Sequence, residues 1–289
     1  MKRLIVLLLT AVAALPFRAS GTGQAAETLI VGRDTMQLFA LPLESADSAV
    51  LARLGARLQE IDAPWSTGCW RRYIGVWRLE KGVLWFERVE TMEGEPVFTG
   101  AELFPESAAG TRVRAAWFSG EVRYGTGKTI YYQHDGFARN LEREWKATLK
   151  NGRVTSSRAY RNRGYETGLD FQENARLLAA AYDPTGLGEV PDNLAFTVKF
   201  AADSSGRAVH IDKAWLVVYE NGNRDYHRIE DLENLLLKEA LRAFRAVTRW
   251  DAWWIDGAWR KQYFVLPLRK NGTAWTPPKL RSGYPYFGS

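Results

Sequence analysis

The stretch FTVKFAADSSGRAVHI (residues 196–211) decides the fold class of the C-terminal part of the chain. Apolar residues alternate with polar ones on both sides of Asp203-Ser204-Ser205-Gly206, as expected of two antiparallel strands joined by a turn. An amphipathic segment follows at residues 232–247, and residues 262–268 return to a strand pattern. This order of strand, strand, helix and strand predicts a helix packed on a small antiparallel sheet.

The chain upstream of this unit is rich in strand patterns. Alternating segments flank Lys81-Gly82, and another pair flanks Asn151-Gly152; both dipeptides are typical of tight hairpin turns. We therefore expect a β-rich domain at residues 27–165.

Two helices are expected outside the C-terminal unit. Residues 47–61 carry leucines on one face, with Asp47 or Ser48 placed to cap the helix, and a second helix begins at Asp170. The fold class predicted for the whole chain is α+β. The expected divisions are a signal peptide at 1–26, a β-rich domain at 27–165, a helix and linker at 166–192, a helix-on-sheet module at 193–272 and a surface tail at 273–289.

The N-terminus has the pattern of a secretory signal peptide. Met1-Lys2-Arg3 is a positive start, residues 4–17 are almost entirely apolar, and small residues lead to a cleavage expected after Ala25 or Ala26. The apolar run is shorter than the roughly 20 residues that a membrane-spanning helix needs. We expect a periplasmic or secreted protein with no stable membrane span after cleavage.

Charge and cysteine content exclude some classes of function. The formal net charge is +6, and removing residues 1–26 takes away three cations and no acid, which leaves +3. A nucleic-acid partner is therefore not expected of the exported chain. Cys69 is the only cysteine and is expected to be buried, although an intermolecular disulfide leaves the oligomeric state open.

No catalytic, cofactor-binding or metal-binding constellation is predicted. Gly125-Thr126-Gly127-Lys128-Thr129 resembles the end of a phosphate-binding loop, but strand-forming residues follow it where a helix is required, so we expect a turn. Ser119, His134 and Asp135 lack the motif of a serine hydrolase. The three histidines are too widely spaced for a structural zinc site. We expect no cofactor, and favour a protein that is not an enzyme.

Aromatic residues are unusually frequent: the chain has twelve Trp, twelve Tyr and thirteen Phe, and most of them are expected to fill cores. Four tryptophans lie close together between Arg249 and Arg260, beside acidic residues that oppose complete burial. We hypothesise that this cluster and the strand after it bind a ligand. The candidate binding residues are Trp253, Trp254, Arg260, Gln262, Phe264, Val265 and Leu268.

The C-terminal segment, about residues 194–270, resembles the TonB C-terminal domain family. The residues that carry the resemblance are Phe196, Val198 and Phe200, the turn that begins at Asp203, Glu239-Ala240-Leu241 with Phe244, and Val265-Leu266-Pro267-Leu268. The resemblance implies a small periplasmic α+β module with an exposed sheet edge, to which an extended peptide can add as a strand. The N-terminal part resembles uncharacterised secreted bacterial proteins around Cys69-Trp70 and residues 116–123.

The sequence thus predicts an exported cell-envelope protein of binding or scaffolding type, whose TonB-like domain recognises an extended peptide or protein. A structural domain without a partner remains open. The alternative function is carbohydrate binding, or carbohydrate chemistry, through the N-terminal aromatic residues; a glycan is accordingly a possible ligand.

Overall fold

The computed structural model describes residues 22–167, 171–220, 225–247, 249–271 and 274–277. Spatial clustering divides the chain into two units whose sequences interleave. Unit 1 comprises residues 1–125, 132–139 and 146–158, and unit 2 comprises residues 126–131, 140–145 and 159–289. Parts of the long strands in the middle of the chain therefore belong to each unit.

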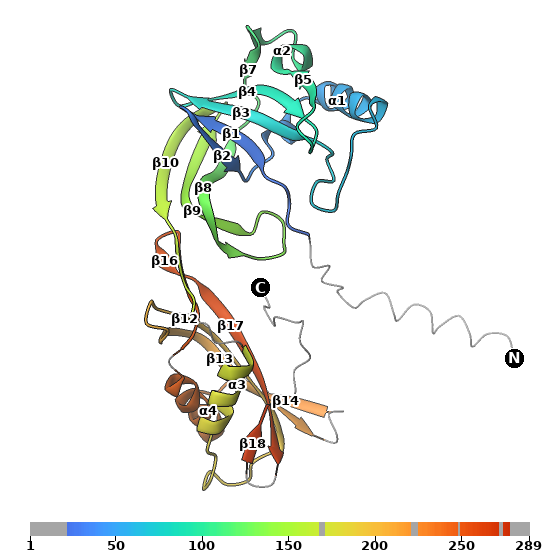
Figure 1. Cartoon of the computed structure of the whole chain (residues 1–289). Coiled ribbons are helices and arrows are strands. Elements are labelled where there is room, and N and C mark those ends of the chain that lie inside the picture. The colour runs from blue at the N-terminus through green and yellow to red at the C-terminus, as the bar shows by residue number, and fades with distance from the viewer. Residues whose placement is uncertain (1–21, 168–170, 221–224, 248, 272–273, 278–289) are drawn as a thin grey trace, which may run out of the picture. The chain divides into compact units, whose positions relative to one another are not determined.

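The prediction of an α+β fold class was wrong. The structure is 50% strand and 18% helix, and seven strands close into a barrel in the order β10-β9-β8-β2-β1-β3-β4. The barrel closes where β10 meets β4, with Arg153 paired to Val83 (Figure 1). Its strands are β1 (Glu27–Val31), β2 (Asp34–Leu38), β3 (Ile74–Glu80), β4 (Val83–Glu90), β8 (Gly120–Tyr132), β9 (Arg139–Lys150) and β10 (Arg153–Arg161).

The local signals in this region are confirmed. Lys81-Gly82 and Asn151-Gly152 connect β3 to β4 and β9 to β10, and all four residues have the positive φ of a tight hairpin turn. Asp47 caps the first helix by accepting a hydrogen bond from the Ala49 amide at 2.8 Å. The remaining elements before β8 are η1 (Pro42–Ser45), α1 (Ser48–Glu60), β5 (Pro96–Thr99), α2 (Gly100–Leu103), β6 (Ala108–Ala109) and β7 (Arg112–Arg114).

The glycine-rich segment at residues 125–129 is not a turn, contrary to our expectation. It lies within the continuous strand β8, so it has no helix after it to bind phosphate. Gly127 has a φ of 93°, and a side chain there would approach Glu142 Oε2 to 2.9 Å. Glycine is thus required at this position by the closeness of β9.

Unit 1 buries a carboxylate between β1 and β3. Glu27 is 1% exposed and accepts hydrogen bonds from Trp77 Nε1 at 2.5 Å and from the Gly75 amide at 3.3 Å. The Arg71 guanidinium lies 3.5 Å away, and burial of the carboxyl still raises its pKa to about 7. A Cβ on Gly75 would come within 2.7 Å of the carboxylate, which explains the glycine there.

The buried Glu27 makes the stability of the protein depend on pH. The pKa of the Glu27 carboxyl rises from an ordinary value of 4.5 to about 7 in the folded protein. Between these two pH values the folded protein holds a proton that the unfolded chain has lost. The free energy of unfolding should therefore fall by roughly 3 kcal/mol as the pH rises through the interval. Urea unfolding of the wild type and Glu27→Gln at several pH values measures this.

The Glu27→Gln variant should be about as stable as the wild type at low pH, where the protonated Glu27 is as neutral as the amide, and its stability should lose most of this pH dependence. An unchanged slope between the two proteins would show that Glu27 is not the titrating group.

Unit 2 is built around a five-stranded antiparallel sheet in the order β14-β13-β12-β17-β18, with α3 and α4 over one face (Figure 1). Side chains of both helices join those of β12, β13 and β17 in one buried cluster, and Phe244 packs edge-to-face on Phe200 with ring centroids 4.8 Å apart. The elements are β11 (Arg163–Tyr165), α3 (Phe171–Ala181), β12 (Asn193–Ala202), β13 (Ala208–Glu220), β14 (Asp225–Ile229), α4 (Leu235–Ala246), β15 (Ala252–Ile255), β16 (Ala258–Trp259), β17 (Lys261–Asn271) and β18 (Ala274–Thr276).

The ends of these elements differ slightly from the expectations. Asn234 caps α4 by accepting from the amides of Leu236 and Leu237, so the helix begins later than predicted. The expected cap of α3 at Asp170 lies outside the described residues. The tail expected from residue 273 starts with the paired strand β18, in which Trp275 is buried.

Candidate functional site

The candidate binding residues lie between the start of β15 and the end of β17 in unit 2. Trp253 and Trp254 belong to β15, Arg260 follows β16, and the others lie on β17. Trp253, Trp254 and Arg260 are half-buried, as are Gln262 and Val265. Phe264 and Leu268 are instead 3% and 0% exposed, because they point into the core under the helices. These two residues therefore support the strand and do not contact a ligand.

The tryptophans are held in a tight hairpin, residues 252–259, which we call the tryptophan hairpin. Its turn is Asp256-Gly257, with φ values of 55° and 80°, as a two-residue hairpin requires. Trp254 faces Trp259 across the hairpin, with ring centroids 5.0 Å apart. Sequence reasoning did not use this Asp-Gly pair, although it is a strong hairpin signal.

Successive side chains of β15 point to opposite faces and make separate aromatic contacts. Trp253 packs edge-to-face on Tyr131, and the Arg260 guanidinium lies over the same tyrosine ring, 3.9 Å from its centroid. Trp254 instead joins Trp259, which also contacts Tyr165. The structure thus brings Trp253 and Arg260 together but places Trp254 in a different cluster.

A second buried carboxylate fixes the tryptophan hairpin in unit 2. Glu144 is 0% exposed and accepts hydrogen bonds from Asn140 Nδ2 at 3.0 Å, Asn162 Nδ2 at 2.8 Å and the Leu141 amide at 2.9 Å. The Asn162 side-chain oxygen accepts from the Asp256 amide in the hairpin turn at 3.0 Å. Asn162 therefore links the buried carboxylate to the hairpin.

The other feature of the site is the edge of β17. This strand pairs with β12 from Lys261 to Arg269, whereas on its other side the described residues provide only β18, which reaches Arg269–Asn271. The Lys270 amide donates to Asp192 on the β12 side. The backbone N–H and C=O groups of successive residues point to opposite sides of a strand. Those of even-numbered residues therefore face β12, and those of odd-numbered residues face the other side. We call residues 261–268 on that side the open edge of β17.

Pro267 fits this geometry. A proline has no N–H, so inside a sheet it is tolerated only where its nitrogen points away from a neighbouring strand. Its odd number places it on the open edge, where its missing N–H leaves one carbonyl of any added strand without a donor. Tyr263 and Val265 have the same orientation and retain their donors.

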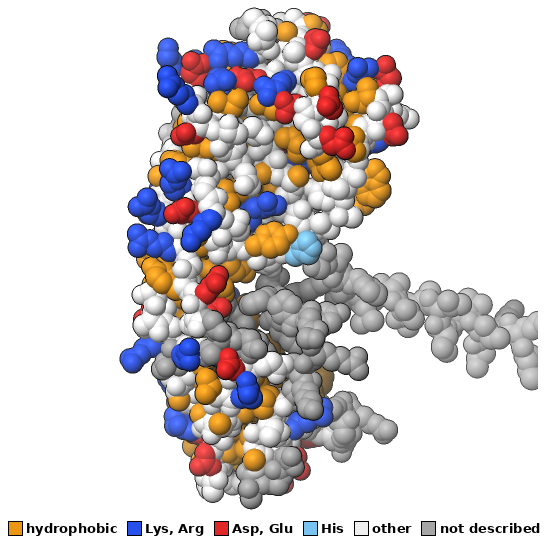
Figure 2. All heavy atoms as spheres, in the orientation of Figure 1, with side chains coloured by type: hydrophobic (Ala, Val, Ile, Leu, Met, Phe, Trp, Pro, Cys, Tyr) orange, Lys and Arg blue, Asp and Glu red, His pale blue; other side chains and the backbone are white. Residues whose placement is uncertain are grey.

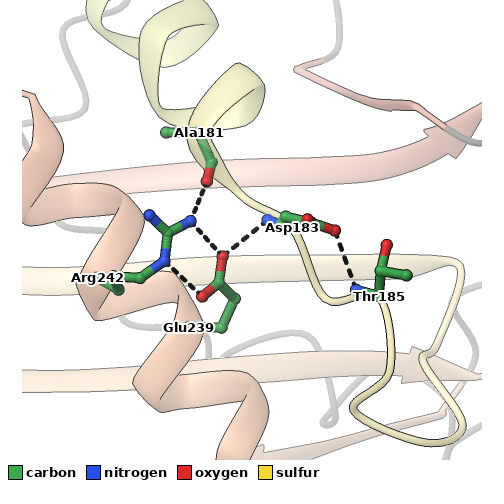
Figure 3. A network of polar contacts seen from close by, with 5 residues as sticks. All are labelled: Ala181, Asp183, Thr185, Glu239 and Arg242. Atoms are coloured by element: carbon green, nitrogen blue, oxygen red, sulfur yellow. Dashed lines mark hydrogen bonds and ion pairs between the residues drawn. The ribbon is translucent and has the colours of Figure 1, made fainter.

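A cavity of about 660 Å³ lies at the C-terminal end of α3, lined by residues that include Tyr182, Asp183, Thr185, Lys270 and Trp275. The chain that leaves α3 is fixed by the polar network in Figure 3. Arg242 binds both oxygens of Glu239, at 2.6 and 2.7 Å, and donates to the last carbonyl of α3.

Glu239 in turn accepts from the Asp183 amide at 2.8 Å (Figure 3). Burial opposes ionisation of Glu239, but its hydrogen bonds with Arg242 and Asp183 keep its pKa below the ordinary value. The network therefore braces two helices and a loop through a stable ion pair, and offers no proton donor near neutral pH.

The structure gives no support to catalysis by the polar residues weighed in the sequence. Ser119 Oγ bonds the backbone and side chain of Asn151, whereas His134 Nδ1 lies 2.7 Å from the Tyr132 hydroxyl. Within the described ranges, no three His, Cys, Asp or Glu residues are placed to hold a metal ion. Cys69 is buried, as predicted, and its thiol donates to the Tyr73 carbonyl.

Comparisons of the chain with protein-family models, with curated proteins and with solved structures find no match.

We expect Asn162→Leu to destabilise unit 2 by at least about 2 kcal/mol, because Glu144 loses a donor and the Asp256 amide loses its acceptor. The tryptophan fluorescence of the folded protein should change as well, since the hairpin is no longer fixed. Chemical denaturation followed by fluorescence measures both effects. Arg143→Ala, at the exposed position of β9 that precedes Glu144, is the control and should change stability by less than about 0.5 kcal/mol. Equal denaturation midpoints for the two variants would refute the role of Asn162.

Proposed function

We propose that this chain is an exported, non-enzymatic protein of the bacterial cell envelope whose C-terminal unit binds an extended peptide or protein segment. The observation that carries the proposal is the open edge of β17. An unpaired strand edge presents N–H and C=O groups to which an extended segment can add by main-chain hydrogen bonds.

The side chains beside the edge indicate what kind of segment fits. Phe264 and Leu266 point into the core under the helices, and Tyr263 and Val265 are half-buried on the opposite face. A strand added to the edge would place its alternate side chains next to these two rows. We therefore expect a segment with apolar residues at alternating positions, and a short one, since Pro267 offers no donor.

Charge supports a protein partner over a nucleic acid. On the face drawn in Figure 2, Lys and Arg side chains are interspersed with Asp and Glu. Near the edge itself, Lys261 and Lys199 both pair with Asp212, at 2.9 and 3.4 Å. A row of unpaired cations, which binding to a phosphate backbone needs, is not seen at this site in the described residues.

Hydrogen exchange of individual amides tests whether the edge is open. In the isolated protein, the amides of Tyr263 and Val265 should exchange quickly, whereas those of Phe264, Leu266 and Leu268, which face β12, should be protected. Two-dimensional NMR after transfer to deuterated buffer distinguishes the two sets. Equal protection of Tyr263 and Phe264 would show that the edge is already covered.

The proposed binding is tested with Val265→Pro, which removes a donor from the open edge but none from the β12 pairing, and with Val265→Ala as the matched control. Envelope proteins cross-linked to the wild type should be lost with the proline variant and retained with the alanine variant, while both variants keep the wild-type melting temperature within a few degrees. Retention of the partner by a folded Val265→Pro protein would refute strand addition.

Export is supported by the leader pattern at residues 1–26. Within the described residues, no helix combines the length and apolarity needed to cross a membrane. The contacts of residues 24 and 25 refine where the leader would be removed. The Gln24 amide donates to Gly136 and the Ala25 amide to Gly68, each at 2.7 Å. Arg139 and Arg71 in turn donate to the carbonyls of the same two residues, at 2.9 and 3.0 Å.

Cleavage after Ala25 or Ala26 would remove all four hydrogen bonds, so we expect the processed chain to begin at Gly23 or upstream of it. Intact-mass measurement and N-terminal sequencing of protein recovered from the periplasm determine the position. A mature chain that starts at Ala26 or Glu27 would show that unit 1 does not need these bonds. A chain of full length in the cytoplasm would refute export.

A further inference from the structure

Trp65 and Trp70 form an exposed aromatic pair on the loop between α1 and β3. Their exposed fractions are 60% and 67%, and their ring centroids lie 5.6 Å apart with 39° between the planes. Both rings precede β3, which begins only at Ile74. Large aromatic side chains normally lose most of their surface on folding, so two adjacent exposed tryptophans need an explanation.

The loop is held firmly, which excludes the simple explanation that the rings lie on an unstructured segment. Cys69 is buried beneath it, and its amide donates to the Ser66 carbonyl at 2.9 Å. Arg72 donates to the Ala63 carbonyl at 2.5 Å and to Asp62 at 3.0 Å. The buried Cys69 side chain points inward, so the neighbouring Trp70 is directed to solvent.

Both ends of the loop have a backbone in the left-handed region. Asp62 has a φ of 46° and Arg72 a φ of 65°, values that residues other than glycine adopt at a cost in free energy. The hydrogen bonds from the Arg72 side chain to the Ala63 carbonyl and to the Asp62 carboxylate offset the cost at Arg72. At Asp62 this conformation ends α1, since the Asp62 amide donates to the Gln59 carbonyl and the Ala63 amide to the Leu58 carbonyl, as at many helix C-termini. Arg72 is the strained position, and its side-chain bonds fix the segment that carries Trp70.

We propose that the Trp65–Trp70 pair binds the uncharged sugar rings of an oligosaccharide. Two flat, tilted ring surfaces suit the C–H faces of successive sugars, and ligand sites of this kind combine aromatic surface with a few polar groups for orientation. The carboxylate of Asp62, whose side chain is 99% exposed, and the Ser66 hydroxyl are on the same loop and can bind sugar hydroxyls. This site and the open edge of β17 lie in different units, so the inference does not rest on the proposed function.

The charges around the pair favour a neutral ligand over an anionic lipid surface. Asp62 and Arg72 pair with each other at 3.0 Å, and Arg71 is buried beside Glu27. Peripheral binding to anionic membranes relies on several unpaired cations beside the aromatic residues, and the described part of this loop has none.

The test is a titration of the mature protein with soluble linear oligomers of glucose and of N-acetylglucosamine, followed by calorimetry and tryptophan fluorescence. We expect binding of at least one oligomer, and an affinity about tenfold or more lower for Trp65→Ala/Trp70→Ala. Tyr226→Ala, which removes a similarly exposed aromatic residue from unit 2, is the matched control and should bind as the wild type does. Since all these rings are more than half exposed, the melting temperatures should agree closely.

The proposal fails if neither oligomer binds, or if the double variant binds as tightly as the wild type. It also fails if the tryptophan fluorescence changes instead on addition of vesicles of phosphatidylethanolamine and phosphatidylglycerol, or of a proline-rich peptide. The proposed class of ligand would then be wrong. Saturable oligosaccharide binding lost only in the tryptophan variants would establish it.

Discussion

The pairing of β17 with β12 is the constraint on which the C-terminal unit depends. It buries Phe264, Leu266 and Leu268 under α3 and α4, and it directs the amides of alternate residues to the opposite side of the strand. The same register explains why Pro267 is tolerated in the sheet. The open edge and the hydrophobic core are therefore two consequences of the position of β17. A shift of β17 by one residue along β12 would exchange the backbone groups that face β12 with those that face the open edge.

Two buried carboxylates connect strands that are distant in sequence. Glu27 links β1 to β3 through Trp77 and Gly75, and Glu144 links β9 to the tryptophan hairpin through Asn162. A buried charge is costly unless donors surround it, so each carboxylate requires its particular neighbours. This requirement favours a single arrangement of the strands over alternatives with a similar apolar pattern.

The proposed function and the further inference both assign binding roles, at separate surfaces. The open edge of β17 uses main-chain groups and is suited to an extended segment, whereas the Trp65–Trp70 pair uses ring surfaces and is suited to a neutral sugar. A protein of the cell envelope that contacts both a protein and a glycan could connect the two. The resemblance to the TonB C-terminal domain family remains a prediction, since the comparisons provide no relative against which to measure it.

The sequence by itself determined the local elements. The hairpins at Lys81-Gly82 and Asn151-Gly152 and the cap at Asp47 were predicted because turn and cap chemistry depends on residues adjacent in the chain. Only the tertiary structure decided that the N-terminal strands close into a barrel, that Glu27 is buried beside Trp77, and that Trp65 and Trp70 are exposed. These features depend on contacts between residues far apart in sequence. An alternating pattern identifies a strand but not its partner, and this is why the predicted fold class was wrong.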